Sequence, residues 1–298
     1  MGVTEQDQSD RPPSRWCAAG DDRVNGRPPR VRGDAGSGEA GPVPHPYLDD
    51  PSGVVALAHR GFSRDGRENS MAAFAAAVDL GFRYVETDAH ATADGVAVAL
   101  HDATLDRTTD GRGAVADLPW STVARARIGG VEPVPRLDEL LGTWPDLHVN
   151  VDVKDARAVR PVAEAVERTR AHDRVCVASF SHARRRATLA LLSRPVARSA
   201  GTLEVARFVA AHRLRLPAAA ARALRDVDAL QVPARQGPLR VVDAGTVAAA
   251  HAGGTAVHVW TVNEPAEMHR LLDLGVDGLV TDRADLLRDV LVARGTWR

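Results

Sequence analysis

The chain has few cysteines and no long apolar run, and both absences narrow the class of protein. Cys17 and Cys176 are its only cysteines and stand far apart in dissimilar contexts, which excludes the disulfide framework of a small secreted domain. No apolar run approaches the roughly 18 residues that span a bilayer. The first residues also lack the apolar segment of a secretory signal. We therefore expect a soluble, cytoplasmic protein without a stable membrane anchor.

The chain also lacks an excess of charge of either sign. Its 38 basic and 39 acidic residues leave a formal net charge of −1, so no strong overall field draws the protein to nucleic acid or to a membrane surface. Any affinity for phosphate must come from a local site. We expect a small-molecule partner and no nucleic acid.

Composition divides the chain into two parts. Residues 1–50 are rich in Gly, Pro, Asp, Arg and Ser, and they show neither helical nor strand periodicity. Such a segment buries too little apolar area to offset the entropy lost on ordering, which predicts a disordered N-terminal tail, with partner binding as the alternative. Residues 51–298 have the texture of one folded domain.

From Gly53 onward, apolar and β-branched runs alternate with Ala- and Leu-rich helical patterns. Helical patterns cover residues 70–80, 158–171, 182–192, 203–212, 242–252 and 266–274. Predicted strands cover residues 54–58, 82–88, 96–100, 148–153, 175–179, 196–200, 228–232, 256–262 and 278–281. This alternation predicts an α/β fold, a TIM (β/α)8 barrel in which a parallel sheet is covered by helices.

The strand count and one spacing do not fit a simple barrel. Nine candidate strands are one too many for eight units, and too few residues separate Asp88 from Val96 for a helical crossover. Either that link is an extended return, or one candidate lies outside the barrel. Residues 102–135 hold no clear strand–helix unit and predict a small insertion after the third strand. A doubly wound open sheet is the competing architecture, but no Gly-rich dinucleotide fingerprint or P-loop supports it.

Polar and titratable residues stand where four consecutive predicted strands end. These residues are His59 and Arg60 after the first strand, Glu86 and Asp88 in the second, His101 after the third, and Asp152 and Lys154 in the fourth. Active sites of such barrels lie at the C-terminal ends of the strands. Glu86 and Asp88 are two apart, so the period of a strand turns both to one face. Any one of these residues alone fits a structural role, but four such ends in succession favour a functional site.

The residue types indicate chemistry at a phosphate. Three carboxylates, Glu86, Asp88 and Asp152, would repel one another unless a cation lay between them, and oxygen donors without thiolates suit Mg²⁺ or Ca²⁺ better than zinc. Arg60 offers a planar fork for phosphate oxygens, and Lys154 either adds a second positive contact or holds Asp152. Two histidines supply an acid and a base near neutral pH. Together they predict phosphoryl transfer.

Residues near this set are interpreted more simply. Asp102, Asp106 and Arg107 fix the loop after the third strand, with orientation of a catalytic histidine by Asp102 as the alternative. The basic run Arg184–Arg186 is interpreted as the solvated face of a helix, with an anion site as the alternative.

Residues 58–113 resemble the signature region of the glycerophosphodiester phosphodiesterase family. They contain a His-Arg-Gly strand end, a Glu-Asn-Ser helix start, Glu-x-Asp, Thr-x-Asp-Gly and a His-Asp-x-x-Leu-x-Arg-x-Thr run. Further similarity lies at 150–154, Ser179-Phe180, 260–263, 275–278 and Thr281-Asp282. The resemblance covers about residues 54–290.

The resemblance implies a TIM barrel with a divalent metal, Mg²⁺ or Ca²⁺ with Mn²⁺ as a further candidate, on Glu86, Asp88 and Asp152. It implies that His59 and His101 are the acid–base pair, that Arg60 contacts the phosphate, and that Trp260 lies near the alcohol portion of the substrate. The family usually has Glu at the position of Asp152, which is one methylene shorter. It also favours Pro where Arg67 stands, a change to which we attach no chemistry.

The expected function is hydrolysis of a glycerophosphodiester to sn-glycerol 3-phosphate and an alcohol. The attacking group is either water or the 2-hydroxyl of the substrate. One alternative is a lysophospholipase D or sphingomyelinase-D-like activity, which an apolar groove beside the metal would favour. The other is a catalytically silent barrel that binds a phosphate ligand.

Overall fold

The computed structural model describes residues 45–297, and the greater part of the predicted tail lies outside them. The last residues predicted as tail, 45–50, belong to the folded unit. They form a short 3-10 helix, η1 (Pro46–Leu48), whose Tyr47 is fully buried. Tyr84 Oη donates to the carbonyl of Tyr47 at 2.9 Å. Folded structure therefore begins before the boundary that composition indicates.

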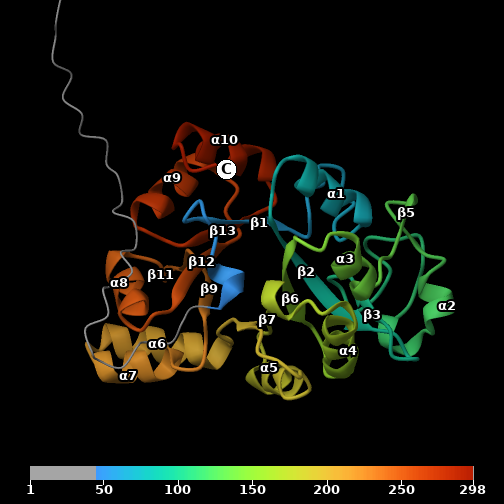
Figure 1. Ribbon diagram of the computed structural model, residues 1–298, viewed down its shortest axis with the longest axis horizontal. Coiled ribbons are helices and arrows are strands. Elements are labelled where there is room, and N and C mark those ends of the chain that lie inside the picture. The colour runs from blue at the N-terminus through green and yellow to red at the C-terminus, as the bar shows by residue number, and fades with distance from the viewer. Residues whose placement is uncertain (1–44, 298) are drawn as a thin grey trace, which may run out of the picture. The chain divides into compact units, whose positions relative to one another are not determined.

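Parallel strands form a nearly closed barrel (Figure 1). The hydrogen-bonded order along the sheet is β8-β7-β6-β2-β1-β13-β12-β9, and a parallel bridge between Ser199 and Ala229 joins its two ends. The strands are β1 (Val55–His59), β2 (Tyr84–Ala91), β6 (His148–Val153), β7 (Val175–Ala178), β8 (Ala197–Arg198), β9 (Ala229–Pro233), β12 (Ala256–Trp260) and β13 (Gly278–Thr281). The predicted TIM barrel is confirmed, and the open sheet is wrong.

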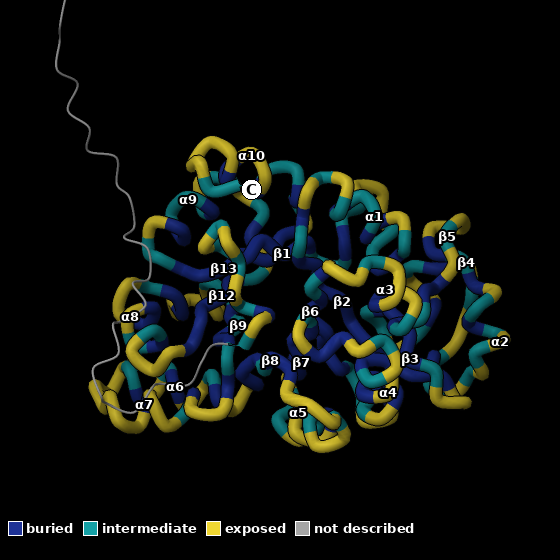
Figure 2. The backbone as a smooth tube through the Cα atoms, in the orientation of Figure 1, coloured by how far each residue is buried: buried dark blue, intermediate teal, exposed yellow. Residues whose placement is uncertain are grey.

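Helices follow the barrel strands and cover their outer surface (Figure 1). They are α1 (Met71–Asp79), α3 (Leu137–Thr143), α4 (Val159–Thr169), α5 (His182–Leu189), α6 (Thr202–Arg213), α7 (Pro217–Leu224), α8 (Ala244–Ala252), α9 (Pro265–Asp273) and α10 (Ala284–Ala293). Figure 2 shows buried strands at the centre and exposed residues on the outward helix faces. The core therefore lies inside the barrel and between barrel and helices.

The ninth predicted strand exists but is not a barrel strand. β3 (Ala97–Ala99) runs back antiparallel to the extended end of β2, with Ala89 opposite Ala99. Leu100 N donates to the carbonyl of Asp88 at 3.0 Å, so the returning chain brings residue 101 back beside Asp88. Of the four consecutive predicted strands that end in the candidate site residues, three are barrel strands, and the third is the extended return that the short link from Asp88 allows.

The predicted insertion follows β3. It holds η2 (Val115–Asp117), α2 (Trp120–Val123) and a short hairpin of β4 (Arg127–Ile128) and β5 (Glu132–Pro133). It has an apolar cluster of its own, made of Val98, Leu100, Leu105, Val115, Val123, Ala126, Ile128 and Val134. A second hairpin, β10 (Arg235–Gln236) and β11 (Leu239–Arg240), follows β9.

The turn from β1 to α1 fixes the residues that follow His59. Arg60 and Asn69 both have a left-handed backbone, with φ of 56° and 58°, which is uncommon for residues other than glycine. A Cβ on Gly61 would lie 2.6 Å from the carbonyl carbon of Ala73, so only glycine lets this loop approach α1. Ser70 caps α1 by accepting from the Ala73 amide at 3.1 Å.

None of the helices within residues 45–297 combines the length and the hydropathy that a transmembrane span requires. The cytoplasmic location stays a prediction.

One buried histidine predicts how stability depends on pH. His258 on β12 is fully buried, and burial lowers the pKa of its imidazole to about 4. In the unfolded chain the value returns to about 6.5, so below that pH the unfolded state binds more protons. The His258 contribution is therefore complete above pH ~6.5 and is lost as the pH falls toward ~4, by about 2–3 kcal/mol.

We expect the stability of the wild type to fall more steeply with acid than that of His258→Gln, which cannot titrate. Denaturant unfolding of both proteins between these pH values measures the difference. Parallel curves over the whole range would show that His258 is not buried in its neutral form.

Candidate active site

Strand register brings the predicted site residues to one level at the C-terminal end of the barrel. His59 on β1 pairs with Glu86 on β2, and Asp88 on β2 pairs with Asp152 on β6. Paired residues on neighbouring parallel strands lie side by side, so these strands place four polar side chains together. Arg60 directly follows β1, and Lys154 directly follows β6.

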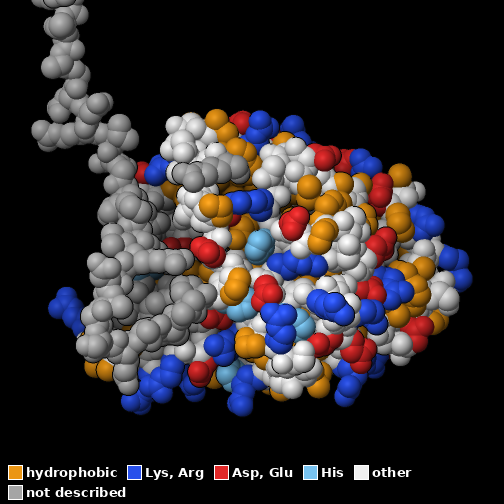
Figure 3. All heavy atoms as spheres, in the orientation of Figure 1, with side chains coloured by type: hydrophobic (Ala, Val, Ile, Leu, Met, Phe, Trp, Pro, Cys, Tyr) orange, Lys and Arg blue, Asp and Glu red, His pale blue; other side chains and the backbone are white. Residues whose placement is uncertain are grey.

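A single cavity of about 940 Å³ collects them. Its lining includes every predicted site residue: His59, Arg60, Glu86, Asp88, His101, Asp152, Lys154 and Trp260. Figure 3 shows histidine, acidic and basic side chains close together near the middle of the face that it presents. One cavity therefore brings together all the residues predicted for the site, and His101 reaches it on the returning strand β3.

Two cations hold Asp88. Lys154 Nζ lies 2.7 Å from Asp88 Oδ1 and 2.8 Å from Asp152 Oδ2, and Arg60 Nε lies 3.1 Å from Asp88 Oδ2. Asn69 Nδ2 donates to the same Oδ2 at 3.1 Å. Burial alone would raise the pKa of Asp88, but Lys154 and then Arg60 outweigh it and lower that pKa. Asp88 is thus an ionised carboxylate whose two oxygens both have partners.

Glu86 and Asp152 are less well compensated. Burial, followed by the charge of Asp88, raises the pKa of the Glu86 carboxyl. Glu86 Oε2 accepts from the Arg60 amide at 3.3 Å and lies 3.7 Å from His59 Nε2. Asp152 Oδ1 is buried without a hydrogen-bond partner. A buried carboxylate oxygen without a partner costs free energy that a bound cation would recover.

These residues fit a hard divalent ion by their chemistry. Glu86, Asp88 and Asp152 supply carboxylate oxygens only, the donors that Mg²⁺ and Ca²⁺ prefer, and the free Oδ1 of Asp152 and the raised pKa of Glu86 point to missing positive charge. Among residues 45–297, however, no three His, Cys, Asp or Glu side chains converge closely enough to hold an ion as they stand. Lys154 Nζ occupies the space between Asp88 and Asp152.

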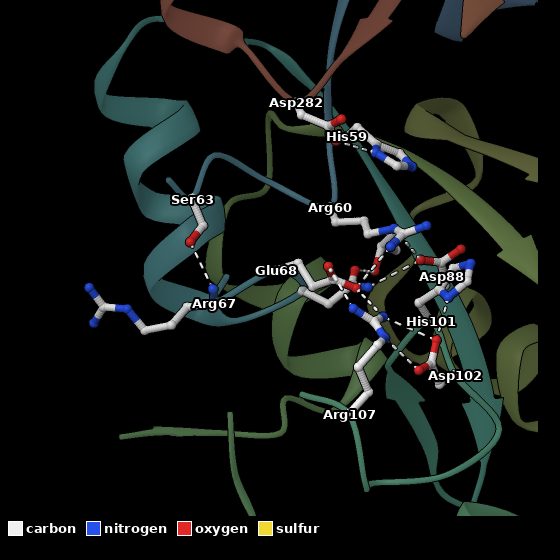
Figure 4. Close-up of polar contacts among 12 residues, drawn as sticks. His59, Arg60, Ser63, Arg67, Glu68, Asp88, His101, Asp102, Arg107 and Asp282 are labelled. Atoms are coloured by element: carbon white, nitrogen blue, oxygen red, sulfur yellow. Dashed lines mark hydrogen bonds and ion pairs between the residues drawn. The ribbon is translucent and has the colours of Figure 1, made fainter. Parts of the chain in front are cut away.

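Asp282, on the loop after β13, holds the first histidine. His59 Nδ1 donates to Asp282 Oδ1 at 2.6 Å, and Asn263 Nδ2 donates to Asp282 Oδ2 at 2.9 Å. Figure 4 shows Asp282 directly beside the His59 ring. Burial alone would lower the pKa of His59, but Glu86 and then Asp282 outweigh it and raise that pKa. A carboxylate on Nδ1 fixes the tautomer and leaves Nε2 for the substrate.

Asp102 holds the second histidine in the same way. His101 Nδ1 donates to Asp102 Oδ1 at 2.6 Å, and Arg107 Nε donates to Asp102 Oδ2 at 2.6 Å. Arg107 also reaches Glu68 Oε1 at 2.7 Å, and Glu68 accepts from Arg60 NH1 at 2.8 Å (Figure 4). The interpretation in which Asp102 orients His101 is therefore supported by the geometry, and one ionic chain joins His101 to the Arg60 guanidinium.

Sequence reasoning missed some of the residues that support the site. Glu68, Asn69 and Asp282 lie within motifs that resemble the family, but the sequence assigns them no role. Glu68 and Asn69 directly precede Ser70, the N-cap of α1, so the sequence suggests only a helix start there. Only the fold places Asp282 beside His59, 223 residues away in the chain. Arg67, where the family favours Pro, lies outside the cavity lining. It pairs with Asp65, and its amide donates to Ser63 Oγ at 2.9 Å (Figure 4).

The Asp282–His59 hydrogen bond leads to a prediction about tautomers. In Asp282→Asn, the amide oxygen stays bonded to Asn263 Nδ2, which turns the new NH₂ group toward His59 Nδ1. That group donates, so it favours the wrong tautomer of His59. We expect kcat to fall roughly 10²–10⁴-fold, the range for losing a general acid or base, with little change in KM.

Adding Asn263→Ala should restore part of the activity, because the amide of the variant can then rotate. Asp285→Asn is the matched control, since Asp285 pairs with Arg283 and does not line the cavity. Steady-state kinetics of the three variants measure the effect. Equal kcat for Asp282→Asn and the control would show that Asp282 has only a structural role.

A TIM barrel that gathers two carboxylate-held histidines, two cations and buried carboxylates at its strand ends belongs to the class of phosphoryl-transfer hydrolases.

Comparisons with known proteins identify the family. The model of the glycerophosphoryl diester phosphodiesterase family matches residues 59–286. A probable glycerophosphodiester phosphodiesterase 2 of Mycobacterium tuberculosis is 49% identical over 246 residues, which cover 82% of this chain and 93% of that protein.

Solved structures show the same fold as this chain. A glycerophosphodiester phosphodiesterase from Agrobacterium tumefaciens superposes with a TM-score of 0.64 at 25% identity, covering 80% of this chain and 99% of that one. An Oleispira antarctica phosphodiesterase, solved in complex with the product sn-glycerol-3-phosphate, shares the fold with a TM-score of 0.65 at 21% identity and covers 80% of this chain and 96% of that one.

The chain belongs to the glycerophosphoryl diester phosphodiesterase family. It is accordingly a phosphoric diester hydrolase, and the family is generally dependent on a divalent metal. The predicted resemblance is confirmed, and the reading as a catalytically silent barrel is set aside.

Proposed function

We propose that the protein hydrolyses glycerophosphodiesters to sn-glycerol 3-phosphate and an alcohol with His59 and His101 as the acid–base pair. The observation that carries the proposal is the matched pair of histidines in one cavity, each bonded at Nδ1 to its own carboxylate. One imidazole deprotonates the attacking hydroxyl, and the other protonates the leaving alkoxide. The product complex of the Oleispira antarctica relative supports the choice of product.

We further propose that Glu86, Asp88 and Asp152 hold a divalent ion, Mg²⁺ or Ca²⁺ with Mn²⁺ as a further candidate. When bound, such an ion neutralises the non-bridging phosphate oxygens and lowers the pKa of a bound hydroxyl. Lys154 then has to give up Asp88 Oδ1 or Asp152 Oδ2, and its ammonium is free to contact the phosphate. Since Asp152 is a methylene shorter than glutamate, its free Oδ1 reaches less far into the cavity.

Arg60 and Trp260 position the substrate in this proposal. Arg60 lines the cavity with its guanidinium held by Glu68 and Asp88, which leaves it oriented to donate to phosphate oxygens in a planar geometry. Trp260, half-buried at the end of β12, packs edge-on against Phe180 with ring centroids 6.0 Å apart. The indole offers an apolar wall for the alcohol portion.

A substrate panel tests the proposed function. Purified protein with added Mg²⁺, Ca²⁺ or Mn²⁺ is incubated with glycerophosphocholine, glycerophosphoethanolamine, glycerophosphoglycerol and, as a control, the monoester glycerol 3-phosphate. We expect turnover of the diesters and none of the monoester. The enzyme is proposed to cleave the ester bond to the alcohol, and glycerol 3-phosphate has only the ester bond to glycerol, which the product keeps. Release of inorganic phosphate from the monoester at a comparable rate would contradict a diesterase.

A further inference from the structure

His90 is a buried histidine that contacts the active site without being part of it. It lies on the part of β2 that continues past Asp88, and it does not line the cavity. Its Nδ1 lies 2.8 Å from Asp155 Oδ2, and its Nε2 lies 3.1 Å from the carbonyl oxygen of His101. A carboxylate and a carbonyl both accept, so both ring nitrogens donate. The His90 side chain therefore joins Asp155 to the backbone of His101.

The backbone of His101 lies where the pairing of β3 with β2 ends. The last contact between the two strands is the Leu100 amide, which donates to the carbonyl of Asp88 at 3.0 Å. Among residues 45–297, no backbone amide donates to the His101 carbonyl, and the ring of His90 supplies its hydrogen bond. The His90 side chain thus holds a backbone position that the sheet itself does not hold.

Asp155 is itself fixed, so its carboxylate gives the imidazole a rigid support. Asp155 Oδ1 accepts from the amides of Arg157 at 2.7 Å and Ala158 at 3.0 Å, which closes the turn that leads into α4. At the start of the same turn, the Lys154 amide donates to the carbonyl of Ala89 at 3.1 Å. Because the turn is held against β2 in this way, the two hydrogen bonds of the ring determine where the imidazole lies.

The position of the His101 ring depends on two sets of contacts. Asp102, which is held by Arg107, fixes the orientation of the ring through Nδ1. His90 fixes the backbone from which the His101 side chain extends. Catalytic groups have to be held within about 0.5 Å of their productive geometry, and a displacement of about 1 Å can lower the rate roughly 100-fold.

We infer that His90 is a positioning residue for His101, whose carbonyl it holds so that the imidazole of His101 stays within reach of the proton that it transfers. This inference rests on the proposed function, because it requires His101 to act as an acid or a base. His90 lies outside the cavity lining and does not touch the substrate. We therefore expect loss of this hydrogen bond to lower kcat and to leave KM and metal affinity nearly unchanged.

Two substitutions separate the two hydrogen bonds of the His90 ring. The amide nitrogen of glutamine is as many bonds from Cβ as Nε2 is, and the amide nitrogen of asparagine is as many bonds from Cβ as Nδ1 is. His90→Gln therefore keeps a donor for the His101 carbonyl, whereas His90→Asn keeps a donor only for Asp155. We expect kcat for glycerophosphocholine to fall roughly 10-fold to 100-fold in His90→Asn and much less in His90→Gln.

The control is a buried histidine that does not contact the active site. His172 is buried, its Nε2 lies 3.1 Å from Glu167 Oε1, and it does not line the cavity. His172→Asn also loses a hydrogen bond at Nε2, so it should lower the melting temperature and keep the wild-type kcat. Thermal unfolding of each variant shows whether it is folded at the assay temperature. If His90→Asn is not, His90→Met, which fills similar space without a donor, takes its place.

A double-mutant cycle shows whether His90 acts through His101. Adding His90→Asn to His101→Ala should lower kcat for glycerophosphocholine no further, because the side chain that His90 positions is already gone. An undiminished effect of His90→Asn in the His101→Ala background would overturn the inference alone. Equal kcat for the wild type, His90→Asn and His90→Gln would do the same. Wild-type turnover by His101→Ala would instead overturn the role proposed for His101.

Discussion

Replacing either His59 or His101 by alanine lowers turnover of glycerophosphocholine by roughly 10²–10⁴-fold, the usual contribution of one general acid or base. Choline and glycerol are poor leaving alkoxides, so both the acid and the base are needed with this substrate. His269→Ala is the control: His269 lies on α9, contacts Arg294 and does not line the cavity. We expect it to keep wild-type turnover.

An activated substrate separates the two roles. The p-nitrophenolate of a p-nitrophenyl phosphodiester departs without a proton, so loss of the acid costs much less, whereas loss of the base costs the same as before. One of the two variants should therefore be substantially rescued, and that variant identifies the acid. If both histidine variants showed equal defects on both substrates with unchanged metal content, the division of labour between His59 and His101 would be wrong.

Removing divalent metal should abolish turnover, and Mg²⁺, Ca²⁺ or Mn²⁺ should restore it. The orphaned Oδ1 of Asp152 and the raised pKa of Glu86 indicate where positive charge is missing. Asp152→Asn should weaken apparent metal affinity roughly 10-fold or more, while KM at saturating metal changes less. Asp152→Glu should be tolerated far better, because it keeps the charge and supplies the residue that is usual in the family.

Metal titrations of activity, together with direct metal analysis of the dialysed protein, measure these effects. Asp173→Asn is the control, since Asp173 is exposed, pairs with Arg194 and is not part of the cavity lining. Full activity in protein shown to be free of metal would exclude a metal-dependent mechanism. Unchanged metal affinity in both Asp152 variants would place the third ligand at another residue.

The sequence predicts the barrel because its strands are nearly continuous apolar runs between helical patterns. It also predicts the site, because a strand period of two turns Glu86 and Asp88 to one face and because parallel strands end at one edge of the barrel. The apolar pattern does not predict the direction of a strand. Residues 96–100 have the same pattern whether they run parallel or antiparallel to β2, and only the short link from Asp88 indicates the return that places His101.

The sequence does not show which residues that are distant in the chain contact one another. The basic run Arg184–Arg186 suggests a solvated face, yet Arg185 is buried, donates to the carbonyl of Ser199 and pairs with Glu204 at 2.7 Å, so that interpretation is wrong for Arg185. Helical periodicity cannot show that a neighbouring helix supplies a buried carboxylate. Val205 and Val209 of α6 are a related case, because the sequence alone shows apolar helix positions and only the fold places them both against the core and in the cavity lining.

Product identity from glycerophosphocholine is the most direct measurement of the central claim. The purified, metal-loaded enzyme is incubated with this substrate, and the phosphorus-containing product is identified by phosphorus NMR and by a stereospecific glycerol-3-phosphate assay. The account predicts sn-glycerol 3-phosphate and free choline in equal amounts, with neither formed by the double variant His59→Ala/His101→Ala. Phosphocholine and glycerol as products, or no product with any of the three metals, would contradict it.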